Sequence, residues 1–212
     1  MQQNNGYNIL IIPCTEWLKG SQQRLHHLSK EWSKKHNVFV FYLERQDDIS
    51  YEKNSSERLA YSNMIKIPTL RLKNYTLFLL ANYLLQLIFF PKIIKKEKID
   101  VIIAEGLGPS NAASIVSKFM KRRFIFDYSD SYSGFVSSYI SNLFFKKIFE
   151  NFAMLMTKIN IKLANATVVV SDGLLSNVGK NDSKEYKRVN WGSKDFFPRN
   201  QVRSDNPALG QI

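Results

Sequence analysis

The residues at positions 105–111 have types and a spacing that suit the binding of a phosphate or a sugar. The segment reads EGLGPSN, follows a continuous apolar run and precedes a helical pattern. Glycines at such a turn let a pyrophosphate approach the amino terminus of a helix, and in dinucleotide sites an acid about twenty residues later binds the ribose. Asp127 lies 21 residues after Gly106, but Asn111 stands where the third glycine belongs. The pattern therefore leaves an NAD-binding enzyme open as an alternative function.

Two acidic residues and a serine follow the next apolar run. Asp127 closes that run, and Ser129 and Asp130 come directly after it. General acid and base catalysis uses two carboxyl groups in different environments, whereas an acidic side chain after a strand also serves as a turn or helix cap. Gly20 and Ser21 follow the first apolar run, where backbone N–H groups can meet a phosphate or a sugar. A plain loop glycine is the alternative there.

The sequence predicts no metal centre and no disulfide. Cys14 is the only cysteine, so neither a disulfide nor a cysteine cluster can form within the chain. The three histidines, His26, His27 and His36, do not have the spacing of a zinc-binding helix motif. A reducing cytoplasm is the compartment that this composition favours.

The strongest deviation in composition is the charge. Thirty lysines and arginines against eighteen acidic residues give a net charge of +12. This balance favours anionic partners such as phosphorylated substrates, anionic lipid or nucleic acid, although a lysine-rich composition by itself is the other explanation. The basic cluster 118–123 contains no recognised nucleic-acid reading element, so we expect no nucleic-acid partner.

Two apolar segments are bordered or interrupted by lysine. They are Leu77–Phe90 and Leu143–Ile161, and both are rich in large aliphatic and aromatic residues. Apolar faces with lysine at their margins suit an anionic membrane surface, whereas a core-facing helix with a solvated back is the alternative. The first segment is shorter than the eighteen or more residues that a spanning helix needs, and no signal peptide opens the chain. We therefore expect a cytoplasmic protein, with peripheral contact on the inner face of the membrane left open.

Short apolar runs alternate with longer helical patterns along the chain. This alternation predicts an α/β fold with an open, mostly parallel, Rossmann-like sheet of about seven strands and helices on both faces. The expected strands are Asn8–Pro13, Val38–Leu43, Asn63–Ile67, Ile99–Ala104, Arg123–Asp127, Ala166–Val170 and Tyr186–Asn190. The expected helices include Gln22–Lys35, Pro109–Lys121 and Val136–Leu163. Leu72–Lys98 is also helical, and Pro91 inside it predicts either a kink or two helices that meet at Phe90 and Pro91. Residues 1–198 form one predicted domain, and 199–212 read as a linker or the start of a further domain.

Five segments occur in an order that is typical of one enzyme family. They are Ile9–Val40, Asp100–Glu105 (DVIIAE), Phe126–Asp130 (FDYSD), Leu163–Ser171 (LANATVVVS) and Val189–Pro198 (VNWGSKDFFP). Together they resemble the N-terminal half of family-4 glycosyltransferases, which have the two-domain GT-B fold. Ile103 and Glu105 replace the two histidines of the family's D-V-V-H-A-H segment, and Ser129 replaces the histidine of its His-Asp pair.

The resemblance implies the acceptor side of a cleft. In this family the N-terminal domain holds the acceptor, the C-terminal domain holds the nucleotide-sugar, and transfer retains the anomeric configuration without a metal. Gly20, Ser21, Glu105, Ser129 and Asp130 would then line the acceptor cleft. Asn190 and Gly192 would belong to the interdomain hinge, and no catalytic residue is assigned.

The predicted function is therefore the acceptor-binding half of a retaining, nucleotide-sugar-dependent glycosyltransferase of the hexosyltransferase type, in glycan, polysaccharide or glycolipid biosynthesis. It needs no cofactor of its own, because the nucleotide-sugar co-substrate would bind a C-terminal domain or partner chain. Its acceptor would be a sugar or a lipid-linked saccharide. We expect the chain to be inactive without that donor-binding domain. A non-catalytic acceptor-binding or membrane-recruiting subunit of a split transferase is the alternative.

Overall fold

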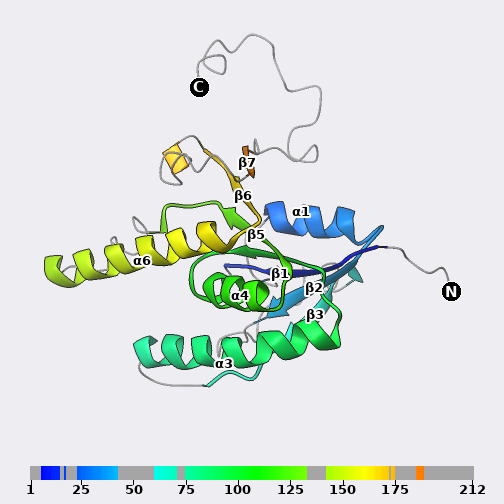
Figure 1. Cartoon of the computed structure of the whole chain (residues 1–212), viewed down its shortest axis with the longest axis horizontal. Coiled ribbons are helices and arrows are strands. Elements are labelled where there is room, and N and C mark those ends of the chain that lie inside the picture. The colour runs from blue at the N-terminus through cyan, green and yellow to red at the C-terminus, as the bar shows by residue number, and fades with distance from the viewer. Residues whose placement is uncertain are drawn as a thin grey trace, which may run out of the picture.

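The chain forms one parallel sheet with helices on both faces (Figure 1). The computed structural model describes residues 6–14, 17, 23–42, 60–70, 75–132, 142–171, 173–174 and 185–188. The strands are β1 (Asn8–Ile12), β2 (Asn37–Tyr42), β3 (Asn63–Lys66), β4 (Val101–Glu105), β5 (Arg123–Tyr128), β6 (Ala166–Val169) and β7 (Glu185–Arg188). The helices are α1 (Gln23–Trp32), α3 (Tyr75–Lys96), α4 (Gly108–Phe119) and α6 (Leu143–Leu163).

The seven strands pair in the order β3-β2-β1-β4-β5-β6-β7, and every pair is parallel. The predicted Rossmann-like fold class is thereby confirmed. Each predicted strand is present with its ends moved by at most two residues. The order of the first six strands is that of the doubly wound nucleotide-binding fold.

Two apolar clusters hold the helices to the sheet. On one face, α1 packs through Leu25 on Ile9, Ile11, Val38, Val40 and Ile103. On the other face, a larger cluster joins α3, α4 and α6 to the strands, with Phe90, Ile94, Val116 and Ile161 among its members. β4 supplies Ile103 to the first cluster and Ile102 to the second because successive strand side chains point to opposite faces.

The helix α3 contains Pro91, which is consistent with the predicted helical segment around it. Proline lacks an N–H and so leaves one helical hydrogen bond unmade, but the helix continues to Lys96 because Phe90, Ile93 and Ile94 are buried against the sheet. Among the described residues, none of the helices is both long enough and apolar enough to cross a membrane.

Candidate functional site at the carboxyl edge of the sheet

The strand order reverses between β1 and β4, and this point locates the candidate site. β1 pairs with β2 on one side and with β4 on the other, so the connections that leave β1 and β4 turn to opposite faces. In open parallel sheets a ligand crevice forms beyond the carboxyl ends of the strands at this switch point. The described residues there include Cys14 after β1, Glu105 at the end of β4, Gly106 after it, and Ser129 after β5.

Glu105 and Asp127 lie side by side at this edge. They are register partners in β4 and β5, and directly paired residues of parallel strands point to the same face of the sheet. Both side chains are buried, with exposed fractions of 8% for Glu105 and 4% for Asp127. Their face is the one that α1 covers, because Ile103 and Ile125, two positions earlier on each strand, pack with the α1 cluster. Two carboxyl groups therefore share one small, poorly solvated region.

Arg24 provides the positive charge of this region. It lies in the first turn of α1, and its guanidinium donates to the carboxylate of Asp127 in a buried ion pair. α1 follows β1 in the chain and begins at the carboxyl edge, so its first turn is the part of the helix that faces the two carboxyl groups. The helix is held in place by Leu25, which is fully buried.

Burial raises the pKa of Asp127 to about 7. Loss of hydration disfavours the charged carboxylate, and the negative charges of Glu105 and Asp130 act in the same direction, whereas Arg24 lowers the pKa. Because burial outweighs the attraction of the arginine, Asp127 exchanges its proton near neutral pH. This is the property that a general acid or base needs.

Ser129 connects the two strand ends. Its hydroxyl donates to Oε1 of Glu105 over 2.5 Å. Ser129 is half-buried and Asp130 is exposed, so the polar cluster reaches from the covered carboxyl groups to the surface. The structure thus brings together three of the predicted acceptor-cleft residues, Glu105, Ser129 and Asp130.

Gly106 lets β1 and β4 approach closely at this edge. Its φ is +90°, and a Cβ built on it would lie 2.8 Å from Cβ of Cys14. Its N–H donates to the hydroxyl of Tyr132 over 2.9 Å, which fixes the turn from the other side. Burial raises the pKa of Tyr132 above its ordinary value, so this hydroxyl stays protonated. The exposed thiol of Cys14 and the buried tyrosine thus border the same glycine.

Asn111, the last residue of segment 105–111, has a structural role. Asn111 is buried, where it accepts from the hydroxyl of Tyr83 over 2.8 Å and donates to Oδ1 of Asn160 over 3.1 Å. These bonds join α3, α4 and α6 through the residue that replaces the third glycine of a dinucleotide fingerprint. Asp127, the acid of that pattern, holds Arg24.

Several predicted residues cannot be placed. Gly20, Ser21, Asn190, Gly192 and the segment 199–212 lie outside the described residues. Sequence reasoning did not find Arg24 or Tyr132. The signal for Arg24 was a single cation in the first turn of the helix after the first strand. Within the described part of the chain, no group of three or more histidine, cysteine, aspartate or glutamate side chains could hold a metal ion.

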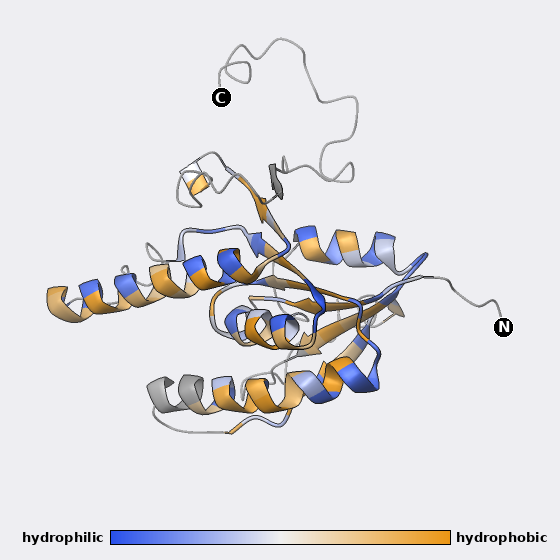
Figure 2. Ribbon diagram, viewed as in Figure 1, coloured by the Kyte–Doolittle hydropathy of each residue, from blue (hydrophilic) through white to orange (hydrophobic). Residues whose placement is uncertain are grey.

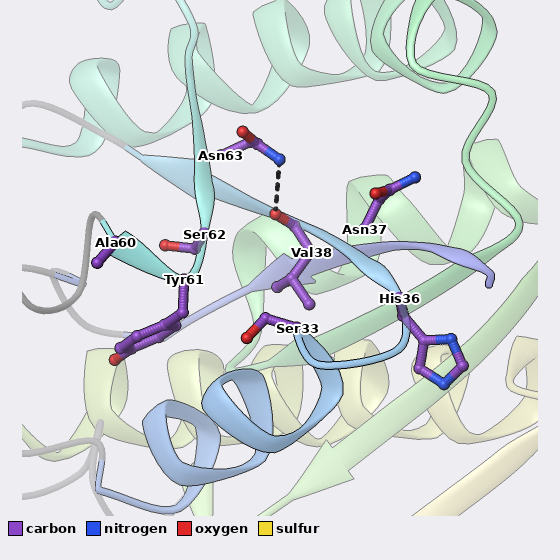
Figure 3. Close-up of a pocket in the computed structure, with 8 residues that line it drawn as sticks. All are labelled: Ser33, His36, Asn37, Val38, Ala60, Tyr61, Ser62 and Asn63. Atoms are coloured by element: carbon purple, nitrogen blue, oxygen red, sulfur yellow. Dashed lines mark hydrogen bonds between the residues drawn. The ribbon is translucent and has the colours of Figure 1, made fainter. Parts of the chain in front are cut away.

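Two hollows lie at the opposite, amino edge of the sheet. One, of about 220 Å³, is lined by Ser33, His36, Asn37, Val38, Ala60, Tyr61, Ser62 and Asn63 (Figure 3). Asn63 and Val38 are joined there by a hydrogen bond of 3.4 Å. The other, of about 280 Å³, contains Lys118, Lys121, Arg122 and Arg123. Because Asn37 and Arg123 begin β2 and β5, neither hollow belongs to the carboxyl-edge site.

Comparison with known proteins places this geometry in a structural class. No protein-family model matches the chain, and no curated protein matches it in sequence. Among solved structures, a glycosyltransferase from Rickettsia africae is similar, with a TM-score of 0.54 and 16% identity over 94% of this chain and 47% of that one. The chain has the fold of one lobe of a GT-B enzyme.

The other similar structures include two kinds of nucleotide-sugar enzyme. A UDP-N-acetylglucosamine 2-epimerase from Rickettsia bellii has a TM-score of 0.56 and 14% identity over 94% of this chain and 50% of that one. A UGT transferase from Siraitia grosvenorii, solved with UDP, has a TM-score of 0.51 and 12% identity over 86% of this chain and 50% of that one. The GT-B-like chain described here thus spans about half the length of the structures that it matches.

Proposed function

We propose that this chain is the acceptor-binding half of a retaining, nucleotide-sugar-dependent glycosyltransferase that acts in glycan, polysaccharide or glycolipid synthesis. The observation that carries the proposal is the polar cluster of Glu105, Ser129 and Asp127 at the switch point of a GT-B lobe. Glycosyltransferases are among the proteins that share this fold. The resemblance of the segments around these residues to family-4 enzymes supports the same assignment.

The cluster has the chemistry to hold a sugar hydroxyl. Carboxylate oxygens accept hydrogen bonds, and a serine hydroxyl both donates and accepts, so Glu105 and Ser129 can share one acceptor hydroxyl between them. Asp127, with a pKa near 7, can accept the proton that this hydroxyl loses during transfer. Arg24 positions Asp127 through the ion pair. Gly20 and Ser21, between β1 and α1 in the chain, would complete the cleft.

In this proposal a second lobe supplies the nucleotide-sugar. A hinge at Asn190 and Gly192, followed by the linker 199–212, would connect it, or it would be a separate partner chain. Transfer with retention places the acceptor hydroxyl on the face from which the diphosphate departs. Catalysis then depends on closure of the two lobes and on stabilisation of the leaving diphosphate, without a metal. A non-catalytic subunit that only binds the acceptor or recruits the enzyme to the membrane remains the alternative within the same architecture.

A nucleotide-sugar epimerase is the second candidate. The specific observation in its favour is the pair of buried carboxyl groups in register, of which one titrates near neutral pH. Epimerisation removes a proton from a sugar carbon and returns it on the other face, and two carboxyl groups in different environments suit that task. Epimerases are also among the solved structures with this fold.

One assay separates these functions. The 212-residue chain is incubated with UDP- and GDP-sugars and lipid-linked saccharide acceptors, alone and together with the donor-binding lobe encoded in frame or by a neighbouring gene. We expect no nucleotide release from the chain alone, and release with a retained anomer when both lobes are present. Glu105→Gln should then lower kcat/KM for the acceptor about tenfold or more, because a hydrogen bond to a charged group is lost.

Other results of this assay would contradict the proposal or favour one of the alternatives. Sugar transfer by the chain alone would contradict the half-enzyme proposal. An epimerised nucleotide-sugar without diphosphate release would favour the epimerase. An acceptor that binds without any turnover in the presence of the second lobe would favour the non-catalytic subunit. Micromolar binding of NAD would restore the dinucleotide alternative.

A further inference from the structure

The amino-terminal half of α6 exposes an unusually apolar surface. Large apolar side chains over thirteen positions of this helix are between 40% and 80% exposed: Leu143, Phe144, Phe145, Ile148, Phe149, Phe152, Met154 and Leu155. Four of the eight are phenylalanine. Single exposed apolar residues are common on protein surfaces, but a contiguous group of this size marks a site of interaction. We call residues 143–155 of α6 the α6 apolar surface, and Figure 2 shows its orange colour toward the free end of the helix.

The amphipathic pattern of α6 is inverted in this half. In the second half, Ala153, Thr157 and Asn160 are buried and face α4. Continued toward the amino terminus at the same spacing of three and four residues, this inward line reaches Glu150 and Lys146, which are half-buried. Lys146 and Glu150 thus continue the buried side of the helix, whereas Phe144, Ile148 and Phe152 lie on the opposite side.

The amino-terminal half of α6 extends past the sheet. Its 21 residues span about 32 Å, whereas the six residues of β5 span about 20 Å. Since the strands are parallel and α6 connects β5 to β6, the helix begins at the carboxyl edge and returns to the amino edge. No residue of α6 before Ala153 is buried. The overhang is visible in Figure 1 as the yellow-green end of the helix, which projects away from the sheet.

The apolar positions form one broad arc. At 100° per residue, Phe144, Phe145, Ile148, Phe149, Phe152 and Leu155 fall within about 140° of the helix circumference. Lys147 and Lys158 lie on one flank of this arc, and Lys162 follows in the last turn. A helix with such an arc can lie in the plane of a membrane with its apolar side among the acyl chains and its lysines at the headgroups.

The positive charge of the chain favours an anionic membrane over a second copy of the chain as the occupant of the α6 apolar surface. The chain carries a net charge of +12, and α6 itself has four lysines against one glutamate. Two copies that met through this surface would repel each other, whereas a bilayer with anionic headgroups would attract it. We infer that the α6 apolar surface inserts into the interfacial layer of an anionic membrane.

The position of this surface also suggests the form of the acceptor. The amino terminus of α6 and the residues Glu105 and Ser129 belong to the same carboxyl edge of the sheet. A docked lobe would therefore present its cleft next to the lipid headgroups, where the saccharide of a lipid-linked acceptor lies. This consequence rests on the proposed function, whereas membrane insertion itself does not.

Vesicle binding tests the inference directly. The 212-residue chain is mixed with vesicles of phosphatidylcholine and phosphatidylglycerol, or of phosphatidylcholine alone, and the bound fraction is measured by flotation. We expect binding to the anionic vesicles that weakens but persists at high salt. The double variant Phe144→Ser/Phe149→Ser should lower the partition coefficient at least about tenfold, since two large apolar groups no longer insert. Phe119→Ser is the matched control, because Phe119 is 82% exposed at the end of α4 and should not affect binding.

Light scattering without lipid tests whether a second copy of the chain occupies the α6 apolar surface instead. Binding that the double variant loses and the control retains would support insertion. A wild-type chain that ignores both vesicle types, or a double variant that binds like the wild type, would overturn it. So would a lipid-free dimer that the double variant dissociates, because the surface would then belong to a second copy. These measurements use no sugar substrate, so their failure is distinct from a failure of the transferase assay.

Discussion

Gly106 occupies a backbone conformation that an L-residue with a side chain rarely adopts. Its φ is +90°, and a Cβ would contact Cys14 at 2.8 Å. Gly106→Ala should therefore lower the free energy of unfolding by about 1–3 kcal/mol, through backbone strain and displacement of the β1 end. Urea unfolding monitored by circular dichroism measures this loss.

Gly108 provides the control for that substitution. It opens α4, and a Cβ at this position would have no atom within 4 Å. Gly108→Ala should leave the stability unchanged or raise it by up to about 1 kcal/mol, because alanine favours the helix. Equal losses from both substitutions would contradict the account of the β1–β4 contact.

Asp127 makes the stability of the fold depend on pH in an uncommon direction. Its pKa is about 7 in the folded chain against 3.8 for an ordinary aspartate, so between these values the folded state keeps a proton that the unfolded state has lost. The contribution of this group to stability is thus complete below about pH 4 and is lost as the pH rises to 7. In the Asp127→Asn variant, the free energy of unfolding should fall less steeply than in the wild type between pH 4 and pH 7. The difference in slope should be up to about 1 kcal/mol per pH unit.

The urea midpoint measured across this pH range tests the prediction. Asp130→Asn is a useful comparison, because removal of that exposed charge should lower the pKa of Asp127. The loss of stability should then be complete at a pH below 7. An Asp127→Asn variant with the same pH profile as the wild type would show that another group causes the decline.

The site residues differ in how far the sequence predicts them. Glu105, Ser129 and Asp130 were predictable because each lies at or just after a recognisable strand, and parallel strands bring such positions to one edge. Arg24 was not, since its contact with Asp127 joins positions 103 residues apart through the packing of α1. The near-neutral pKa of Asp127 also depends on burial, which residue spacing does not report.

Asn142 begins the overhanging part of α6. Its side chain accepts from the N–H groups of Phe144 and Phe145 over 3.0 and 3.3 Å, and so satisfies two donors at the helix start. Asn142→Ala should destabilise the first turns of α6 by about 1 kcal/mol, whereas Asn142→Asp should preserve the two capping hydrogen bonds and the stability of these turns. Because these turns bury nothing, we expect faster amide exchange over 145–152 with little change in the global unfolding midpoint. A global loss of stability as large as the local one would contradict the independence of the overhang.

At the scale of elements, periodicity predicted the strands and the helices α1, α3 and α4, but not which side of α6 faces the protein. The helices around Leu25, Phe90 and Val116 follow from apolar spacing, and their burial confirms them. For the segment Leu143–Ile161, the sequence left open whether it is a core-facing helix or one that contacts a membrane. The buried positions Ala153 and Thr157 show which side faces the protein, and Phe144 and Phe152 lie on the opposite side.

For the whole molecule, the alternation of strands and helices predicted the parallel sheet but not its strand order. The order depends on which side of β1 the later strands join, and this is decided by the packing of α3, α4 and α6 in one layer. The order then places the switch point between β1 and β4. The proposal of a half-enzyme belongs to this scale, and it predicts that the chain alone binds an acceptor without consuming a nucleotide-sugar.

The single sulfhydryl of the protein lies at the carboxyl edge of the sheet, beside the candidate site. Cys14 is exposed and is the only cysteine in the chain, and a Cβ built on the glycine that follows Glu105 would lie 2.8 Å from its Cβ. A maleimide or iodoacetamide dye would consequently attach at one defined point, with no engineering of the native chain. The rate of this alkylation, followed during titration with candidate saccharides, would report occupancy of the cleft before any reaction product is known.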